Sequence, residues 1–83
     1  MKVDFLILGA TGQDGTLLRE FLSKKDKSYS LVTRKIDFKD EFSKSIYSGD
    51  LTDKQFVREI LQDGIFRYII NYANDSFVQN NEG

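Results

Sequence analysis

The chain has 83 residues, with 12 lysines and arginines against 13 aspartates and glutamates and a formal net charge of −1. This balance argues against a protein that binds the nucleic-acid backbone through a basic surface. Cysteine and histidine are both absent, which excludes disulfides and thiolate metal sites and removes the commonest general base near neutral pH. A chain of this length forms one domain at most and buries only about 60–65% of its unfolded surface.

The first predicted element is a strand over residues 3–8, VDFLIL, an almost continuous apolar run that is typical of a parallel strand covered on both faces. Asp4 interrupts the run and Gly9 ends it, so it falls short of the roughly 7–15 residues of a signal peptide's apolar part. No apolar stretch approaches the roughly 20 residues that span a membrane. We therefore expect a cytoplasmic protein with neither a membrane nor a nucleic acid among its partners.

A helix is predicted to start at residue 13 or 14 and to end near residue 24. The apolar residues that recur there at helical spacing are Leu17, Leu18, Phe21 and Leu22. A short strand follows over residues 29–33, YSLVT. Residues 35–44 are expected to form a polar loop with at most one turn, and residues 45–48, SIYS, a third and very short strand.

A second helix is predicted to begin with a capping box formed by Thr52 and Gln55. Its apolar face would consist of Phe56, Val57, Ile60 and Leu61. Gly64 stands where a C-terminal cap belongs. Residues 66–72, FRYIINY, form the fourth predicted strand.

This alternation of strands and helices predicts an α/β fold with a Rossmann-type parallel sheet. We expect about four strands in the order 3-2-1-4, with one of the two helices on each face of the sheet. The sequence contains no internal repeat and no proline-rich or glycine-rich linker that would mark a domain boundary.

Three glycines lie between the first predicted strand and the first predicted helix: Gly9, Gly12 and Gly15. In a dinucleotide-binding loop the first glycine allows the tight turn, the second lets the backbone approach a pyrophosphate, and the third lets helix and strand pack closely. The free N–H groups at the start of the helix would then face the phosphates. The alternative is a turn without a ligand. A P-loop is excluded because no Gly-Lys-Ser/Thr follows.

The segment GATGQDGTLLREFL, residues 9–22, resembles the first turn of the extended short-chain dehydrogenase/reductases, the NAD-dependent epimerase/dehydratase family. Within that family it is most similar to the GDP-mannose 4,6-dehydratases, whose pattern is G-[IV]-T-G-Q-D-G. Residues 47–53, YSGDLTD, resemble their Y-G-D-L-T-D, and residues 69–81 resemble their I-Y-N-L-[AG]-A-Q-S-H-V. The resemblance implies that residues 1–83 are the N-terminal part of an NAD(P)-binding Rossmann domain, without catalytic and substrate regions.

The resemblance also implies which residues bind the cofactor. These are Gly9, Thr11, Gly12, Gln13, Asp14, Gly15, Arg34, Asp50, Leu51, Ala73 and Ser76. Asp50 and Leu51 would hold the adenine, although Asp50 could instead cap the following helix. Ala73 would line the path of the ribose and pyrophosphate, and Ser76 would lie near the nicotinamide half.

The end of the second strand decides between NAD and NADP, because an acid there binds the ribose 2′-OH and an arginine accepts a 2′-phosphate. The residues at this point are Thr33, Arg34 and Lys35, similar to the family's V-R-R. We therefore expect NADP, with Arg34 as the anion partner and Lys35 as a second candidate. Asp37 would favour NAD if the strand ended later, and Arg34 could also be an ordinary solvated charge.

The family's catalytic pair, Tyr-x-x-x-Lys, does not occur in the chain. The residues four positions after its tyrosines are Thr33, Leu51, Tyr72 and Ser76. We therefore assign no catalytic residue and expect the chain alone to be inactive. In a full-length, homo-oligomeric relative, the resemblance implies that NADP serves the dehydration of the nucleotide sugar GDP-mannose.

Two positions depart from the family's A-Q-S-H-V, because Asp75 replaces the glutamine and Phe77 replaces the histidine. An acid near bound phosphates is unfavourable for an anionic ligand. The alternatives are therefore a fragment of a sugar-nucleotide epimerase, a non-catalytic NAD(P)-binding module, or a fragment that binds nothing.

Overall fold

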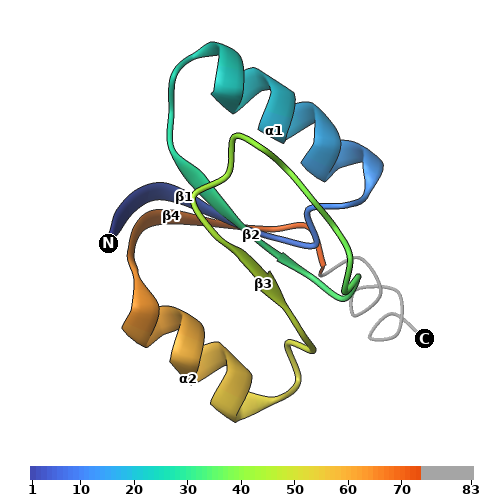
Figure 1. Cartoon of the computed structure of the whole chain (residues 1–83), viewed down its shortest axis with the longest axis vertical. Helices are drawn as coiled ribbons and strands as arrows, with labels where there is room; N and C mark the ends of the chain where they lie inside the picture. The colour runs from blue at the N-terminus through green and yellow to red at the C-terminus, as the bar shows by residue number, and fades with distance from the viewer. Residues whose placement is uncertain (74–83) are drawn as a thin grey trace, which may run out of the picture.

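The computed structural model describes residues 1–73, which form a parallel four-stranded sheet with a helix on each side (Figure 1). In chain order the elements are β1 Lys2–Leu8, α1 Gln13–Lys24, β2 Tyr29–Thr33, β3 Ile46–Ser48, α2 Lys54–Asp63 and β4 Ile65–Asn71. The strand order is β3-β2-β1-β4. The predicted α/β fold and its strand order are therefore confirmed.

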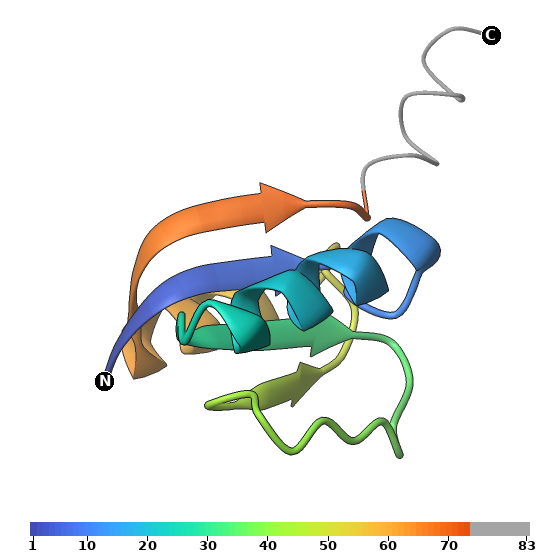
Figure 2. The ribbon, with the colours of Figure 1, turned by 90° about the horizontal axis from the view of Figure 1, so that it is seen from above.

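The strands lie side by side and run in one direction, as Figure 2 shows. The first helix covers one face of the sheet and the second helix covers the other (Figure 1). This is the arrangement expected when successive crossovers lead outward from β1 in opposite directions. No helix among residues 1–73 is both long and apolar enough to cross a membrane.

The core consists of two layers, one on each face of the sheet. The layer between α1 and the sheet contains Ile7, Ala10, Leu22, Tyr29 and Leu31. The layer between α2 and the sheet contains Leu6, Val32 and Ile60. Successive side chains of a strand point to opposite faces, so β1 and β2 contribute to both layers. All five residues of β2 are buried, which explains why its sequence reads as a continuous strand signal.

The second helix begins one residue later than the capping box predicted. Asp53 is the N-cap, and its carboxylate accepts hydrogen bonds from the backbone N–H groups of Gln55 at 3.0 Å and Phe56 at 3.4 Å. Thr52 is not the cap, because its N–H and its hydroxyl both donate to Asp50, at 2.9 Å each. The predicted capping box was therefore wrong, since the side-chain amide of Gln55 also donates to Glu59 instead of returning to the cap. Gly64 is the C-cap, as predicted.

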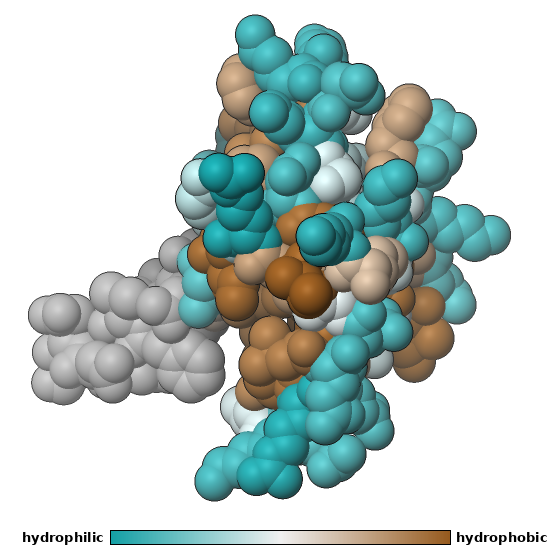
Figure 3. All heavy atoms as spheres, turned by 90° about the vertical axis from the view of Figure 1, so that its left-hand side faces the viewer, coloured by the Kyte–Doolittle hydropathy of each residue, from teal (hydrophilic) through white to brown (hydrophobic). Residues whose placement is uncertain are grey.

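The fourth strand begins at Ile65 rather than at residue 66, because the Ile65 N–H donates to the Met1 carbonyl at 2.7 Å. This strand pairs only with β1 among residues 1–73, and Ile65, Tyr68 and Ile69 remain at least half exposed. Figure 3 looks at the end of the sheet where these strands begin and shows apolar residues gathered between the two polar helical flanks. The edge of the sheet that β4 forms is thus apolar and only partly covered.

The apolar face of α1 is narrower than its sequence suggested. Leu22 is buried and Leu18 is partly buried, but Leu17 and Phe21 are more than half exposed. The described chain therefore covers only part of the apolar surface that the helical pattern predicted.

Candidate cofactor-binding site

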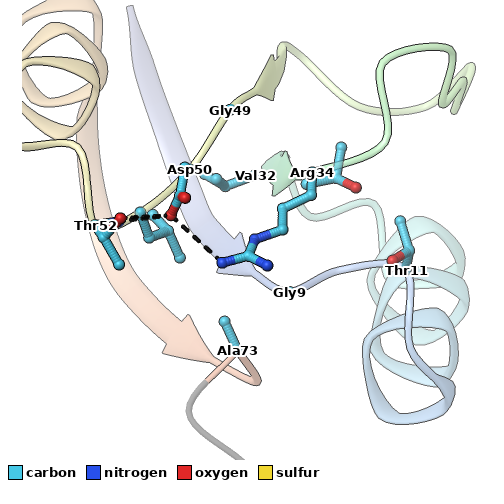
Figure 4. A pocket seen from close by; sticks show the side chains of 10 residues that line it. Gly9, Thr11, Val32, Arg34, Gly49, Asp50, Thr52 and Ala73 are labelled. Atoms are coloured by element: carbon cyan, nitrogen blue, oxygen red, sulfur yellow. Dashed lines mark hydrogen bonds and ion pairs between the residues drawn. The ribbon is translucent and has the colours of Figure 1, made fainter. Parts of the chain in front are cut away.

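A pocket of about 480 Å³ lies at the carboxyl ends of the strands (Figure 4). Its lining residues are Gly9, Thr11, Val32, Thr33, Arg34, Gly49, Asp50, Leu51, Thr52 and Ala73. The loops that follow all four strands contribute to it. In open α/β sheets, ligands bind in the crevice outside the carboxyl ends of the strands, where the strand order reverses. In this sheet the order reverses at β1, directly beside the pocket.

A second pocket of about 240 Å³ lies at the start of α1. It is lined by Gly9, Gly12, Gln13, Asp14, Gly15 and Tyr72. Both pockets share Gly9, so together they form one elongated site. All the predicted cofactor residues up to Ala73 line one pocket or the other, and Ser76 lies outside the described residues.

The three glycines of the loop have three different environments. Gly9 adopts a φ of +73°, which favours glycine, and a Cβ there would lie 2.6 Å from the backbone nitrogen of Ala73. A Cβ on Gly15 would lie 2.6 Å from the carbonyl oxygen of Ala10. A Cβ on Gly12, by contrast, would meet no atom of the described chain within 4 Å. One glycine thus makes the turn, one packs the helix onto the loop, and one leaves its backbone open to the pocket.

The N-terminus of α1 opens onto the smaller pocket. Gly12 is its N-cap, and no side chain in the described part of the chain caps it. The first N–H groups of a helix have no partner within the helix, and the dipole makes this end partially positive. Gln13 and Asp14, at the first helical positions, line the pocket. The backbone N–H groups at this end of α1 can therefore donate hydrogen bonds to the oxygens of an anionic ligand.

Arg34 and Asp50 face each other across the larger pocket, as Figure 4 shows. The Arg34 Nη2 lies 3.5 Å from the Asp50 Oδ1, and the two side chains are 79% and 52% exposed. Hydrogen bonds from the Thr52 backbone N–H and then from its hydroxyl hold the pKa of Asp50 below its usual value. The Asp50 carboxylate is therefore ionised near neutral pH and fixed in orientation.

Two of the alternatives raised by the sequence are settled by this geometry. Asp50 does not cap α2, because Asp53 does. The second strand ends at Thr33 as predicted, and of the three charged residues that follow, only Arg34 lines the pocket, whereas Lys35 and Asp37 do not.

Five residues line the pockets although the sequence analysis did not assign them to the cofactor: Val32, Thr33, Gly49, Thr52 and Tyr72. Each stands within two positions of a predicted cofactor residue and within four positions of the end of a strand. The general position of ligand sites in α/β sheets was therefore the signal that pointed to them.

A family model described as GDP-mannose 4,6 dehydratase matches residues 6–81. The matched range contains both pockets, from Gly9 to Ala73. No curated protein and no solved structure gives a significant match. The family is one of dehydratase-like enzymes that use a nucleotide cofactor. The chain therefore belongs to the GDP-mannose 4,6-dehydratase family.

Proposed function

We propose that this chain is the N-terminal, cofactor-binding part of a GDP-mannose 4,6-dehydratase-like lyase and that it binds NADP across the two pockets. The observation that carries the proposal is the division of roles among Gly9, Gly12 and Gly15. A turn without a ligand needs flexibility, but it does not need an open glycine backbone at a helix N-terminus. A dinucleotide loop needs all three roles.

The pyrophosphate would lie at Gly12 and the first turn of α1. The open space beside Gly12 lets phosphate oxygens approach the backbone N–H groups, and the helix dipole stabilises negative charge there. Close packing of Gly15 against Ala10 holds the helix end near the strand, so these N–H groups stay directed at the pocket.

The adenosine end would lie in the larger pocket between β2 and β3. The Asp50 carboxylate, oriented by Thr52, would accept from the exocyclic amine of adenine beside Leu51. Arg34 would pair with the ribose 2′-phosphate. The ion pair between Arg34 and Asp50 is exposed and therefore weak, so a phosphate can replace Asp50 as the partner of Arg34 at little cost.

In a full-length relative, NADP when bound would accept and return the hydride that accompanies loss of water from GDP-mannose, in a cytoplasmic homo-oligomer. The present chain has no Tyr-x-x-x-Lys pair, so we propose that residues 1–83 bind the cofactor without turnover. The residues that bind, Arg34, Asp50 and the glycine loop, contribute orientation and charge recognition.

Calorimetric titration of the 83-residue chain with NADP⁺ and with NAD⁺ tests the proposal. We expect Gly12→Ala to weaken the binding of both at least about tenfold, because the added methyl group occupies the space of the ligand. Its effect on unfolding should be limited to about 1 kcal/mol, because alanine is a poorer N-cap than glycine but meets no atom of the described chain. Arg34→Ala should weaken NADP⁺ alone. Lys35→Ala is the matched control, since this neighbouring cation lies outside the pocket. No saturable binding of either nucleotide at millimolar concentration would contradict the proposal.

A further inference from the structure

The guanidinium group of Arg19, on α1, connects three separate segments. Its Nε donates to the Ala10 carbonyl at 3.1 Å, its Nη2 to the Thr16 hydroxyl at 3.0 Å, and its Nη1 to the Asp40 carboxylate at 2.8 Å. It also lies 4.9 Å above the ring of Phe38. The Arg19 side chain is only 14% exposed, and its four partners fix the orientation of the guanidinium group.

Asp40 holds Arg19 from the segment between β2 and β3. Its side chain is 6% exposed and accepts the Tyr29 hydroxyl at 2.9 and 3.0 Å and the Phe42 N–H at 2.9 Å. Burial alone would raise the pKa of Asp40, but the hydrogen bonds from Arg19, Phe42 and Tyr29 hold it below its usual value. Asp40 is therefore a buried anion that orients the arginine.

The Ala10 carbonyl is the point at which this network reaches the glycine loop. Ala10 is fully buried, and its backbone packs against Gly15 while its oxygen accepts from Arg19. The Thr16 hydroxyl, which accepts from Arg19, itself donates to the Gly12 carbonyl at 2.8 Å. Arg19 thus supports the loop on both sides of Gly12 without lining either pocket.

We propose that Arg19 is a positioning residue for the phosphate-binding loop, and that Asp40 and Tyr29 determine cofactor affinity by holding Arg19 in place. The inference rests on the proposed function for the identity of the ligand. It extends the determinants of binding to Phe38 and Asp40, in the segment between β2 and β3, which line neither pocket.

The geometry of the arginine side chain allows the charge and the positioning to be separated. A lysine at position 19 keeps the positive charge for Asp40, but its single ammonium cannot reach the three separated acceptors as the planar guanidinium does. Arg19→Lys should therefore loosen the loop while leaving Asp40 paired.

The experiment measures two quantities on the full chain, the NADP⁺ dissociation constant and the amide hydrogen exchange of Gly9 and Thr16. These two amides donate to Val32 and Gly12 and report on the shape of the loop. Exchange is compared with that of Leu31, whose amide is bonded in the sheet and reports on global opening.

We expect Arg19→Lys and Asp40→Asn to raise the dissociation constant at least about tenfold and to speed exchange of the Gly9 and Thr16 amides relative to Leu31. The control pair is Tyr29→Phe against Tyr47→Phe. Tyr47 donates to Asp63 at 2.7 Å on the opposite face and does not touch the loop, so only Tyr29→Phe should weaken binding.

Unchanged affinity and unchanged relative exchange in Arg19→Lys and Asp40→Asn would overturn the inference and leave Arg19 with a purely stabilising role. If the native chain binds no dinucleotide, the proposed function fails, and the exchange of the two loop amides alone decides the role of Arg19. If Arg19→Lys does not fold, the milder Asp40→Asn decides by the same two readouts.

Discussion

The two faces of the sheet use the same pair of side chains, a tyrosine and an aspartate, in opposite settings. On the α1 face the hydroxyl of the buried Tyr29 bonds to Asp40, whose side chain is 6% exposed and pairs with Arg19. On the α2 face the Tyr47 hydroxyl bonds to Asp63 at the surface, at 2.7 Å. The first pair belongs to a network that reaches the glycine loop, whereas the second joins only β3 to the end of α2.

This difference indicates where polar interactions decide the structure. The α2 face is held by apolar contacts around Ile60 and by a local cap at Asp53. The α1 face adds the largely buried ion pair of Arg19 and Asp40. Removing one partner of such a pair leaves the other charge away from water and unpaired, which is strongly destabilising. The face that carries the candidate phosphate-binding loop should therefore be the more sensitive to polar substitutions.

The largest expected effect comes from breaking the buried ion pair. Asp40→Ala leaves the Arg19 guanidinium buried without its anion, and we expect a loss of about 3–5 kcal/mol in the free energy of unfolding. Asp63→Ala, the counterpart on the other face, should cost less than about 1 kcal/mol, because Asp63 is exposed. Urea unfolding measures both, and similar losses would remove the proposed distinction between the faces.

A smaller loss in the free energy of unfolding is expected when a glycine on each face is replaced by alanine. Gly15→Ala forces a Cβ to within 2.6 Å of the Ala10 backbone, which cannot yield, at a cost of about 2–3 kcal/mol. Gly49→Ala brings a Cβ to 2.7 Å from the ring of Phe56, a side chain that can rotate away, so it should cost about 1 kcal/mol. Thermal unfolding of the two variants compares them, and a larger loss for Gly49→Ala would contradict the prediction.

High pH should separate the two tyrosines. Burial, followed by the hydrogen bond to Asp40, raises the pKa of Tyr29 to about 12, above its unfolded value of 10.0. The folded state therefore gains stability from neutral Tyr29 below pH 10, and this gain, on the order of 2 kcal/mol, disappears as the pH rises through 12. Urea unfolding from pH 8 to pH 12 should show this loss in the native chain.

Tyr29→Phe should remove most of the alkaline loss, because the more buried of the two ionising groups is gone. The pKa of Tyr47 is also raised, by burial and then by Asp63, so Tyr47→Phe provides the comparison on the other face. We expect a weaker alkaline effect from Tyr47, which is less buried than Tyr29. An alkaline transition that is identical in the native chain and in Tyr29→Phe would show that another group controls it.

The smallest expected effect lies within β2. The Ser30 hydroxyl is buried and has no hydrogen-bond partner among residues 1–73, and it points to the α2 side because Tyr29 and Leu31 point to the α1 side. Ser30→Ala should therefore stabilise the fold by about 0.5–1 kcal/mol. Ser28→Ala is the contrast, since the Ser28 hydroxyl bonds to Asp4 and its removal should destabilise the fold. Chemical unfolding with a destabilised Ser30→Ala would contradict the prediction.

The sequence was sufficient for the fold and for most of the residues that line the candidate site, because both depend on local patterns. The strand over Tyr29–Thr33 and the helix over Gln13–Lys24 have the predicted bounds, and the glycine spacing identified the loop. Local patterns failed where two neighbours could take the same role. Thr52 and Asp53 are both good caps, and a hydrogen bond to Asp50 decided between them.

The Arg19 network could not be predicted for a different reason. Arg19 and Asp40 come together because the segment after β2 returns to α1. The course of this irregular segment cannot be predicted from a helical or strand periodicity. The helical pattern likewise does not show which apolar positions other segments will cover. Leu17 and Phe21 fit the pattern but remain exposed. Contacts between distant irregular segments follow from the completed fold rather than from the sequence near each residue.

The central position of β1 has a consequence for the order in which the chain can fold. Every strand pairing within residues 1–73 is parallel, so these strands form no early hairpin, and Lys2 must find Ile65 across nearly the whole described chain. Such non-local pairings close long loops before they gain contacts, which slows folding. During synthesis, β1 remains without one of its two neighbours until β4 has left the ribosome, so the domain should acquire its native sheet in a late, cooperative step.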